Sequence, residues 1–501
     1  MCGIAAVVRE NERGPLLRAL LADIAHRGEP ATAQESADLA PLGVALGTNR
    51  LPIVDPPHGA QPQTSPSGRY RLVFNGEVFN HRALADELGV PDRGDTAALV
   101  AAINQWGPEQ AVRRCVWEGV FVCVDTRDRA VWTARDHIGV KPLYRATVDG
   151  GVAWASEIKA LVPHAMGVIE PVVPGTLTRY RDGATQATTW WRPADHSGIA
   201  AVDPAEAVER VADLVHAAVR ARVPEGRYAV ALSGGVDSSL VLGLAQRVND
   251  RVTAYTLARP DSPDLPFARE LCRLLDVPLV EVPAAAPRQL GDALPTVVRS
   301  VESWEWHVVN HAGPMTALYA AIRADGHRVT LTGEGADELF LGYTAPGNPA
   351  PVDATALAGE RLARVGALHR TNCRRLDRMA MAETVECRVP LLDRALTEYA
   401  LGLHPALAVR DGLNKWVLRR AALRWVPARF ALRTKLSFAR GAGFDYGVHA
   451  ASSVYGHVPD RAGVLPEPWS SLARYPMERI FLRHFLDNGY DKADYLCSRS
   501  V

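Results

Sequence analysis

Paired cysteines, long apolar runs and an excess of charge of either sign are all missing from this sequence. The seven cysteines, at positions 2, 115, 123, 272, 373, 387 and 497, are odd in number, scattered and contain no C-x-x-C, so neither a disulfide framework nor a zinc site is indicated. The amino terminus is apolar for only six residues after Cys2, and no later run approaches the roughly 18 residues of a membrane span. We therefore expect a cytoplasmic protein without a signal peptide or a membrane anchor.

The balance of charge and the choice of basic residue are also informative. The 56 Lys and Arg residues equal the 56 Asp and Glu residues, so the chain has no general field that attracts nucleic acid or anionic lipid. We expect no nucleic-acid or membrane partner. Lysine is scarce, because only five of the 56 basic residues are lysine: Lys141, Lys159, Lys415, Lys435 and Lys492. Each lysine is therefore an exception to be explained.

The first part of the chain predicts a layered α+β domain. With 501 residues, the chain is long enough for two or three domains. Short apolar runs such as 70–74 and 120–124 end at Gly, Asn or Asp and are typical of strands, whereas helical periodicity occurs mainly at 82–88 and 95–105. Turn-forming residues dominate 191–198, where we expect a linker.

The second part predicts a parallel sheet. From Pro204 onward, helices and strands alternate: helix 205–220, strand 228–232, helix 239–248, strand 252–257, helix 267–275 and strand 279–282. Such alternation is typical of parallel α/β sheets. The remainder contains one more candidate strand, 328–332, and amphipathic segments such as 415–425, so it is expected to be mostly helical.

A predicted strand runs directly into a candidate phosphate-binding loop. The loop reads Ser233-Gly234-Gly235-Val236-Asp237-Ser238-Ser239 and opens a helix. Two glycines let successive backbone N–H groups turn toward an anion, and the helix amino terminus attracts negative charge. No Gly-Lys-Ser/Thr follows, so this is not a Walker loop. Asp237 would be repelled by a bare polyphosphate, which indicates Mg²⁺ between them. The alternative is a strand-turn-helix corner without a ligand.

A second acidic segment follows another predicted strand. Gly333-Glu334-Gly335-Ala336-Asp337-Glu338 places three carboxylates close together, and their repulsion must be offset by a cation, a lysine or water. A metal-nucleotide site offers one explanation. A solvated helix start offers another, since acidic residues suit the first turn of any helix.

Cys2 is a candidate nucleophile. Removal of Met1 would leave a residue with both a thiol and a free α-amine, which titrates near pH ~8 and can accept the thiol proton. This is the chemistry of an amino-terminal nucleophile. A second-position cysteine without consequence is the alternative.

Further residues suit glutamine as the substrate of such a nucleophile. Arg50 can hold a carboxylate, Asp95 can hold an ammonium group, and Asn75 with Gly76 can donate to an oxyanion. Each of these residues also has a purely structural interpretation, and an Asn-Gly pair most often forms a turn.

With these motifs, the chain resembles the asparagine synthetase family, whose members have a class II glutamine amidotransferase domain fused to an ATP pyrophosphatase domain. The resemblance covers nearly the whole length. It rests on an ordered set of segments: Met1–Ile4, His26–Gly28, Asn75–Asn80, Arg135–Tyr144, Ser156–Leu161, Ser233–Ser239, Gly333–Glu338 and Glu386–Pro390. It implies an amino-terminal-nucleophile domain over 1–195 and an α/β parallel-sheet ATP pyrophosphatase domain with extra helices over 204–501. The oligomeric state stays open, with a homodimer as one option.

The resemblance also implies site residues and a reaction. Cys2 would release ammonia from glutamine through a thioester, and a tunnel would carry it to a carboxylic acid activated by ATP-Mg as its acyl-adenylate. Attack would yield an amide, AMP and pyrophosphate. Site residues are carried over as follows: Arg50, Asn75, Gly76, Glu77 and Asp95 for glutamine; Leu232, Leu257, Thr332 and Gly333 for the nucleotide; Asp237 and Asp337 for magnesium; Glu334 beside the acyl centre; Lys435 and Lys415 for developing charge.

Departures from the family pattern leave the acceptor open. The run Glu302-Ser303-Trp304-Glu305-Trp306-His307-Val308-Val309-Asn310 has Asn310 near the place of a family arginine, so a carboxylate clamp is missing there. The residues after Lys435 and after Gly28 also depart from the pattern. Aspartate is the default acceptor, and a specialised carboxylic acid is the rival. We hypothesise that Trp304, Trp306 and His307 line a wider acceptor pocket, with core packing of the tryptophans as the alternative.

The sequence disfavours two other classes of function. A non-catalytic scaffold has no use for the whole set of Cys2, Asp237, Glu334, Asp337 and Lys435. An ATP pyrophosphatase that thiolates or ligates RNA is disfavoured by the neutral charge and the unpaired cysteines.

Overall fold

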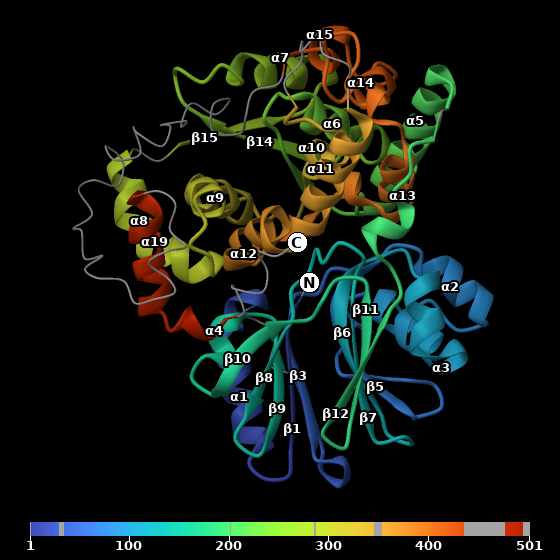
Figure 1. Ribbon diagram of the computed structural model, residues 1–501, viewed down its shortest axis with the longest axis vertical. Helices are drawn as coiled ribbons and strands as arrows, with labels where there is room; N and C mark the ends of the chain where they lie inside the picture. The colour runs from blue at the N-terminus through green and yellow to red at the C-terminus, as the bar shows by residue number, and fades with distance from the viewer. Residues whose placement is uncertain are drawn as a thin grey trace. The chain divides into compact units, whose positions relative to one another are not determined.

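Two structural units divide the chain (Figure 1). The computed structural model describes residues 2–29, 35–200, 202–284, 287–344, 353–434 and 476–493. Unit 1 contains Met1–Arg192, Met381–Thr384 and His484–Val501, and unit 2 contains Pro193–Ala380 and Val385–Arg483. Within the described ranges, no helix is both long enough and apolar enough to cross a membrane.

Unit 1 is built on two antiparallel six-stranded sheets. The first has the strand order β10-β8-β9-β1-β3-β2, and the second has the order β12-β11-β7-β6-β5-β4. The strands are β1 (Cys2–Arg9), β2 (Glu35–Leu39), β3 (Val44–Arg50), β4 (Gln63–Thr64), β5 (Tyr70–Val78), β6 (Trp117–Asp125), β7 (Ala130–Arg135), β8 (Tyr144–Val148), β9 (Gly151–Ala155), β10 (Ala165–Pro171), β11 (Thr176–Arg181) and β12 (Ala184–Thr189).

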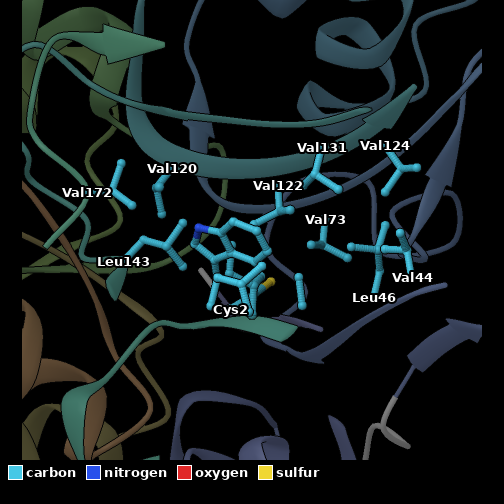
Figure 2. Packing of buried hydrophobic residues seen from close by; sticks show 14 residues of the cluster. Cys2, Val44, Leu46, Val73, Val120, Val122, Val124, Val131, Leu143 and Val172 are labelled. Atoms are coloured by element: carbon cyan, nitrogen blue, oxygen red, sulfur yellow. The ribbon is translucent and has the colours of Figure 1, made fainter. Parts of the chain in front are cut away.

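One hydrophobic core joins the two sheets (Figure 2). Val120, Val122 and Val124 of β6 contribute to it together, because alternate residues of a strand point to the same face. Leu46 and Trp154 meet them from the first sheet. Helices α1 (Arg13–Asp23) and α4 (Ile158–Leu161) contact the first sheet, and α3 (Asp95–Arg114), with α2 (His81–Leu88) against it, contacts the second. The predicted layered α+β fold is confirmed.

Unit 2 is built on a parallel five-stranded sheet of order β15-β14-β13-β16-β17. Its strands are β13 (Tyr228–Ala231), β14 (Val252–Ala258), β15 (Leu279–Pro283), β16 (Val329–Leu331) and β17 (Glu386–Arg388). Its helices include α5 (Pro204–Arg222), α6 (Val236–Val248), α7 (Leu265–Leu275), α8 (Pro287–Val301), α9 (Trp306–Ala324), α10 (Ala336–Leu339), α11 (Ala354–Ala367), α12 (Asn372–Ala382), α13 (Arg394–Gly402), α14 (Trp416–Ala422) and α15 (Ala428–Ala431). Helix α19 (Pro476–Asp487) begins in unit 2, and its residues from His484 onward are counted in unit 1.

The predicted alternation of strands and helices in unit 2 is confirmed, with one shortened helix. The periodicity predicts a helix over 415–425, but α14 begins at Trp416 because Lys415 has a left-handed backbone (φ +53°) that a right-handed helix does not contain. Asp203 caps α5 by accepting hydrogen bonds from Ala205 N (2.8 Å) and Glu206 N (3.1 Å).

The order of the strands brings two candidate site segments together. Strands β13 and β16 are neighbours, with Val230 paired to Leu331, so the segments that follow them leave the sheet at the same edge. A Cβ added to Gly333 would lie 2.7 Å from the backbone N of Ser238, which shows how closely the two segments approach. Only glycine allows this contact.

Candidate active sites

The first candidate site in unit 1 centres on Cys2. Strand β1 begins at Cys2. The backbone N of Cys2 donates to Asn75 Oδ1 at 3.1 Å. The Cys2 side chain is buried, and burial raises the pKa of its thiol. The thiol is therefore protonated near neutral pH, and a base is required to make it a nucleophile.

Asn75 and Gly76 lie within a strand and do not form a turn, so the turn interpretation is wrong. In β5 they pair with Val120 and Gly119 of β6. A Cβ on Gly76 would lie 2.3 Å from the carbonyl O of Glu118, so the strand needs glycine here. Asn75 Nδ2 is buried and has no acceptor among the described residues. One end of this amide thus accepts from the Cys2 nitrogen, and Asn75 itself is buried and does not line the pocket described next.

A small pocket brings most of the predicted glutamine-binding residues together. Cys2, Arg50, Gly76, Glu77 and Asp95 all line it. Arg50 is positioned by a hydrogen bond from Nη2 to Pro56 O (2.6 Å), and Asp95 Oδ2 accepts from Val78 N (3.4 Å). A guanidinium and two carboxylates in one pocket match the carboxylate and the ammonium group of a free amino acid.

Sequence reasoning missed Gln61, which also lines this pocket. Its amide bonds to the backbone of Phe74 on β5, accepting from Phe74 N (2.7 Å) and donating to Phe74 O (3.2 Å). Its Nε2 lies 3.9 Å from Cys2 Sγ. Nothing in the local pattern around Gln61 marks it, because its role comes from contacts across the fold.

Buried charges support the start of β1. Arg27 donates from Nε to Cys2 O (3.3 Å) and from Nη1 to Glu157 Oε1 (2.7 Å). His26 and Lys159 also contact Glu157. These residues belong to segments that carry the family resemblance, and they hold the backbone of the nucleophile in place.

The second candidate site is a cavity of about 610 Å³ in unit 2. Most of the predicted nucleotide-binding and acyl-site residues line it: Leu232, Ser233, Gly235, Asp237, Ser238, Leu257, Thr332, Gly333, Glu334, Asp337 and Lys415. Gly234 and Ser239 do not line it. Ser239 is buried, and Gly234 O accepts a hydrogen bond from Arg433 Nη1 (2.9 Å). Lys435 lies outside the described residues.

The loop between β13 and α6 has the shape of an anion cradle. Ser233 N donates to Ser238 Oγ at 3.1 Å, which folds the loop back on the start of the helix. Gly234 has φ +76°, and a Cβ there would lie 2.9 Å from Asp264 O. The amino terminus of α6 lies at the wall of the cavity, because Gly235, Val236 and Asp237 line it, and a helix amino terminus stabilises a phosphate.

A lysine bridges the two predicted magnesium ligands. Lys415 Nζ lies 2.7 Å from Asp237 Oδ2 and 2.8 Å from Asp337 Oδ1. Burial alone lowers the pKa of Lys415, but the two carboxylates outweigh it and the pKa rises. A cation is thus already stable between these carboxylates. Carboxylate oxygens beside a phosphate loop are the ligands that Mg²⁺ uses in nucleotide sites, so the residues present fit that ion.

The other carboxylates of the acidic segment are held by α12 and by Tyr343. Glu334 accepts from Arg375 Nη2 (2.7 Å) and from Asn372 Nδ2 (3.1 Å). Glu338 accepts from Asn372 Nδ2 (2.9 Å) and from the Tyr343 hydroxyl (2.8 Å). Burial and the neighbouring carboxylates raise the pKa of Glu338 to about 7. The segment lines a cavity, so its interpretation as a solvated helix start is wrong.

The hypothesis that Trp304 and Trp306 line the acceptor pocket is wrong, because neither residue lines the cavity. Trp304 is 1% exposed, and the ring of Trp306 stacks on Phe481 with centroids 5.8 Å apart. His307 does line the cavity, together with Arg370 and Arg375, two cations that the sequence analysis did not single out.

Comparison with known proteins assigns both parts of the chain. Residues 1–208 match the glutamine amidotransferase domain, and residues 210–357 and 349–450 match asparagine synthase. Asparagine synthetase B (glutamine-hydrolyzing) of Escherichia coli K12 is 30% identical over 446 residues, covering 84% of this chain and 78% of that protein. A probable asparagine synthetase of Schizosaccharomyces pombe is 30% identical over 497 residues (89% and 86%), and asparagine synthetase 3 of Arabidopsis thaliana is 28% identical over 467 residues (89% and 80%).

Proposed function

Because the chain belongs to the asparagine synthetase family, we propose that it is a glutamine-dependent, AMP-forming amide synthetase with aspartate as the default acceptor. Unit 1 releases ammonia from glutamine, and unit 2 uses it to convert a carboxylic acid to its amide. The enzyme is then a carbon–nitrogen ligase, and the relatives compared above are named glutamine-hydrolyzing asparagine synthetases.

In unit 1, Cys2 is the nucleophile and its own α-amine is the base. After removal of Met1, the neutral amine takes the thiol proton while sulfur attacks the side-chain amide carbon of glutamine. Asn75 Oδ1, 3.1 Å from the Cys2 nitrogen, orients the amine, and Asn75 Nδ2 with the Gly76 backbone stabilises the oxyanion. Ammonia leaves, and water then hydrolyses the thioester to glutamate. Arg50, Glu77 and Asp95 hold the two ends of the amino acid.

In unit 2, the loop Ser233–Ser239 binds the phosphates of ATP, and Leu232, Leu257, Thr332 and Gly333 surround the nucleotide. Asp237 and Asp337 would hold Mg²⁺, which supplies charge neutralisation to the phosphates when bound. A carboxylate oxygen of the acceptor attacks the α-phosphorus and expels pyrophosphate. Ammonia then attacks the acyl carbon and AMP leaves. Glu334 lies beside the acyl centre, and Lys415 and Lys435 stabilise developing negative charge.

The observation that supports this proposal best is the convergence of Asp237, Lys415 and Asp337 beside the loop in one cavity. A corner without a ligand has no use for a buried lysine between two carboxylates. A different carboxylic acid, amidated by the same mechanism, is the second candidate. It is favoured by Asn310, which is buried and does not line the cavity, so that no clamp is present at that position.

The test is the product of ATP cleavage. With ammonia and an acceptor acid, the purified protein should release AMP and pyrophosphate, and release should stop when either the acid or ammonia is left out. Asp237→Asn should remove this activity while glutamine hydrolysis continues. Cleavage of ATP to ADP would overturn the proposal.

A further inference from the structure

Among the residues that the structure describes, one arginine that lines the cavity of unit 2 has no hydrogen-bond or ion-pair partner. Six basic side chains line this cavity: Arg364, Arg370, Arg375, Lys415, Arg419 and Arg433. Five of them have acceptors, for example Glu360 for Arg364 (2.8 Å) and Glu334 for Arg375 (2.7 Å). Within the described part of the chain, Arg370 makes no hydrogen bond or ion pair, and its Nε is buried without an acceptor. A partly buried cation of this kind is stabilised when a ligand brings an anion to it.

Arg370 belongs to a different wall of the cavity from the phosphate loop. It ends the short helix η4 (Leu368–Arg370), just before α12. Arg375 of α12 contacts His311 Nδ1 of α9 at 3.2 Å, so η4, α12 and α9 form one wall. Figure 1 shows α6, which carries the phosphate loop, apart from α9 and α12. The loop has its own cation in Arg433, which donates to Gly234 O.

This wall has the chemistry of a site for an organic acid. Met315, Leu318 and Leu376 line it with apolar surface. Beside it, Glu334 is held by Arg375 and lies where the resemblance places the acyl centre. A planar guanidinium is the side chain that binds a carboxylate with two parallel hydrogen bonds.

Building on the proposed function, we propose that Arg370 binds the second, non-reacting carboxylate of the acceptor. Aspartate, the default acceptor, carries such a second carboxylate. Arg370 supplies, from the end of η4, the clamp that Asn310 does not supply from α9. Arg370 has no acceptor within the described ranges, and a clamp for a substrate carboxylate requires a guanidinium that is not already engaged.

The test compares two acids that differ by one charge, succinate and succinate monomethyl ester, with aspartate as a third acceptor. Ammonia-dependent AMP release should favour the dicarboxylates over the ester. Arg370→Gln should raise KM for succinate by roughly 10- to 100-fold, leave KM for ATP within about twofold, and remove the preference over the ester, because one charge-assisted contact is lost. Arg370→Lys should restore part of the preference.

Arg364→Gln is the matched control, because Arg364 lines the same cavity but is held by Glu360. It should leave the preference for succinate unchanged. A preference for the ester, or an unchanged preference in Arg370→Gln, would overturn the role of Arg370 while leaving the proposed function intact. A rise in KM for ATP instead would make Arg370 a phosphate ligand, which also overturns it.

Calorimetry separates this inference from the proposed function, since it does not depend on turnover. Succinate titrated into the protein with a non-hydrolysable ATP analogue should bind, and Arg370→Gln should weaken binding by the same factor as KM. If no acid supports AMP release, the proposed function fails. Equal binding of succinate to the wild type and to the variant would then reject the clamp separately.

Discussion

Lys415 Nζ donates to Asp237 Oδ2 at 2.7 Å and to Asp337 Oδ1 at 2.8 Å, so one ammonium group links the segments that follow β13 and β16. Two carboxylates that face one cavity repel each other unless a cation lies between them. Lys415 provides that cation in the protein alone. When Mg²⁺ and ATP bind, the same two carboxylates are the groups available to the ion.

Replacing Lys415 with methionine should expose this relationship. We expect the free energy of unfolding to fall by about 3–5 kcal/mol, because the variant leaves two carboxylates without their buried partner. Millimolar Mg²⁺ should restore part of the lost thermal stability. Lys492→Met is the control, since Lys492 donates to the carbonyls of Val162 and Ala165 and to no carboxylate of the described residues, and Mg²⁺ should not affect this variant. Melting curves with and without Mg²⁺ measure this effect. Identical melting temperatures of Lys415→Met with and without Mg²⁺ would contradict a metal site at these carboxylates.

Cys2→Ala should separate the two activities. Glutamine-dependent amide formation is expected to disappear, because the nucleophile is lost, whereas amide formation from added ammonia should continue at its normal rate. Cys115→Ala is the matched control, because Cys115 is also a buried thiol of unit 1 but does not line the Cys2 pocket. Loss of both activities in Cys2→Ala would contradict separate sites.

Asn75→Ala should lower kcat for glutamine hydrolysis by roughly 10²- to 10³-fold with little change in KM, since an oxyanion donor acts mainly in the transition state. As a control, Asn80→Ala removes the hydrogen bond that Asn80 Oδ1 accepts from Val116 N (2.9 Å), and Asn80 does not line the pocket. This variant should lose stability but keep kcat. Initial rates of glutamate release measure both, and an increase in KM alone for Asn75→Ala would show that Asn75 only binds substrate.

Glutamine hydrolysis should depend on pH through the amine of Cys2. Burial raises the pKa of the Cys2 thiol, so the thiol keeps its proton near neutrality. The free amine, with a pKa of about 8, accepts that proton only in its neutral form. We therefore expect kcat/KM for glutamine to rise as pH increases through about 8 and then to level off. A profile that is flat between pH 6 and 9 would rule out the amine as the base.

The meeting of the phosphate loop and the acidic segment in unit 2 was predictable from the sequence, because it follows from one rule of topology. The carboxyl ends of parallel strands lie at one edge of a sheet, so the loop after 228–232 and the acidic segment after 328–332 meet once their strands are neighbours. Lys415 comes from a distant part of the chain. Its contact with Asp237 has no local signal beyond the scarcity of lysine.

The features that were missed depend on contacts across the fold. Asn75-Gly76 looks like a turn locally, yet Gly76 and Gly119 pair across β5 and β6, where a side chain on Gly76 would meet the Glu118 carbonyl. Gln61 and Arg370 lie outside any periodic pattern or motif. Trp304 was instead expected to line the acceptor pocket, because it lies in a segment that departs from the family pattern. It is buried in the protein and does not line the cavity.

The most direct test follows the nitrogen atom. The protein is given glutamine labelled with nitrogen-15 at the side-chain amide, ATP, Mg²⁺ and the acceptor acid, and the amide product is weighed by mass spectrometry. Nitrogen supplied through Cys2 should appear as one labelled atom in each amide, with one AMP released for each. Unlabelled amide, or labelled ammonia released without any amide, would contradict the coupling of the two chemistries.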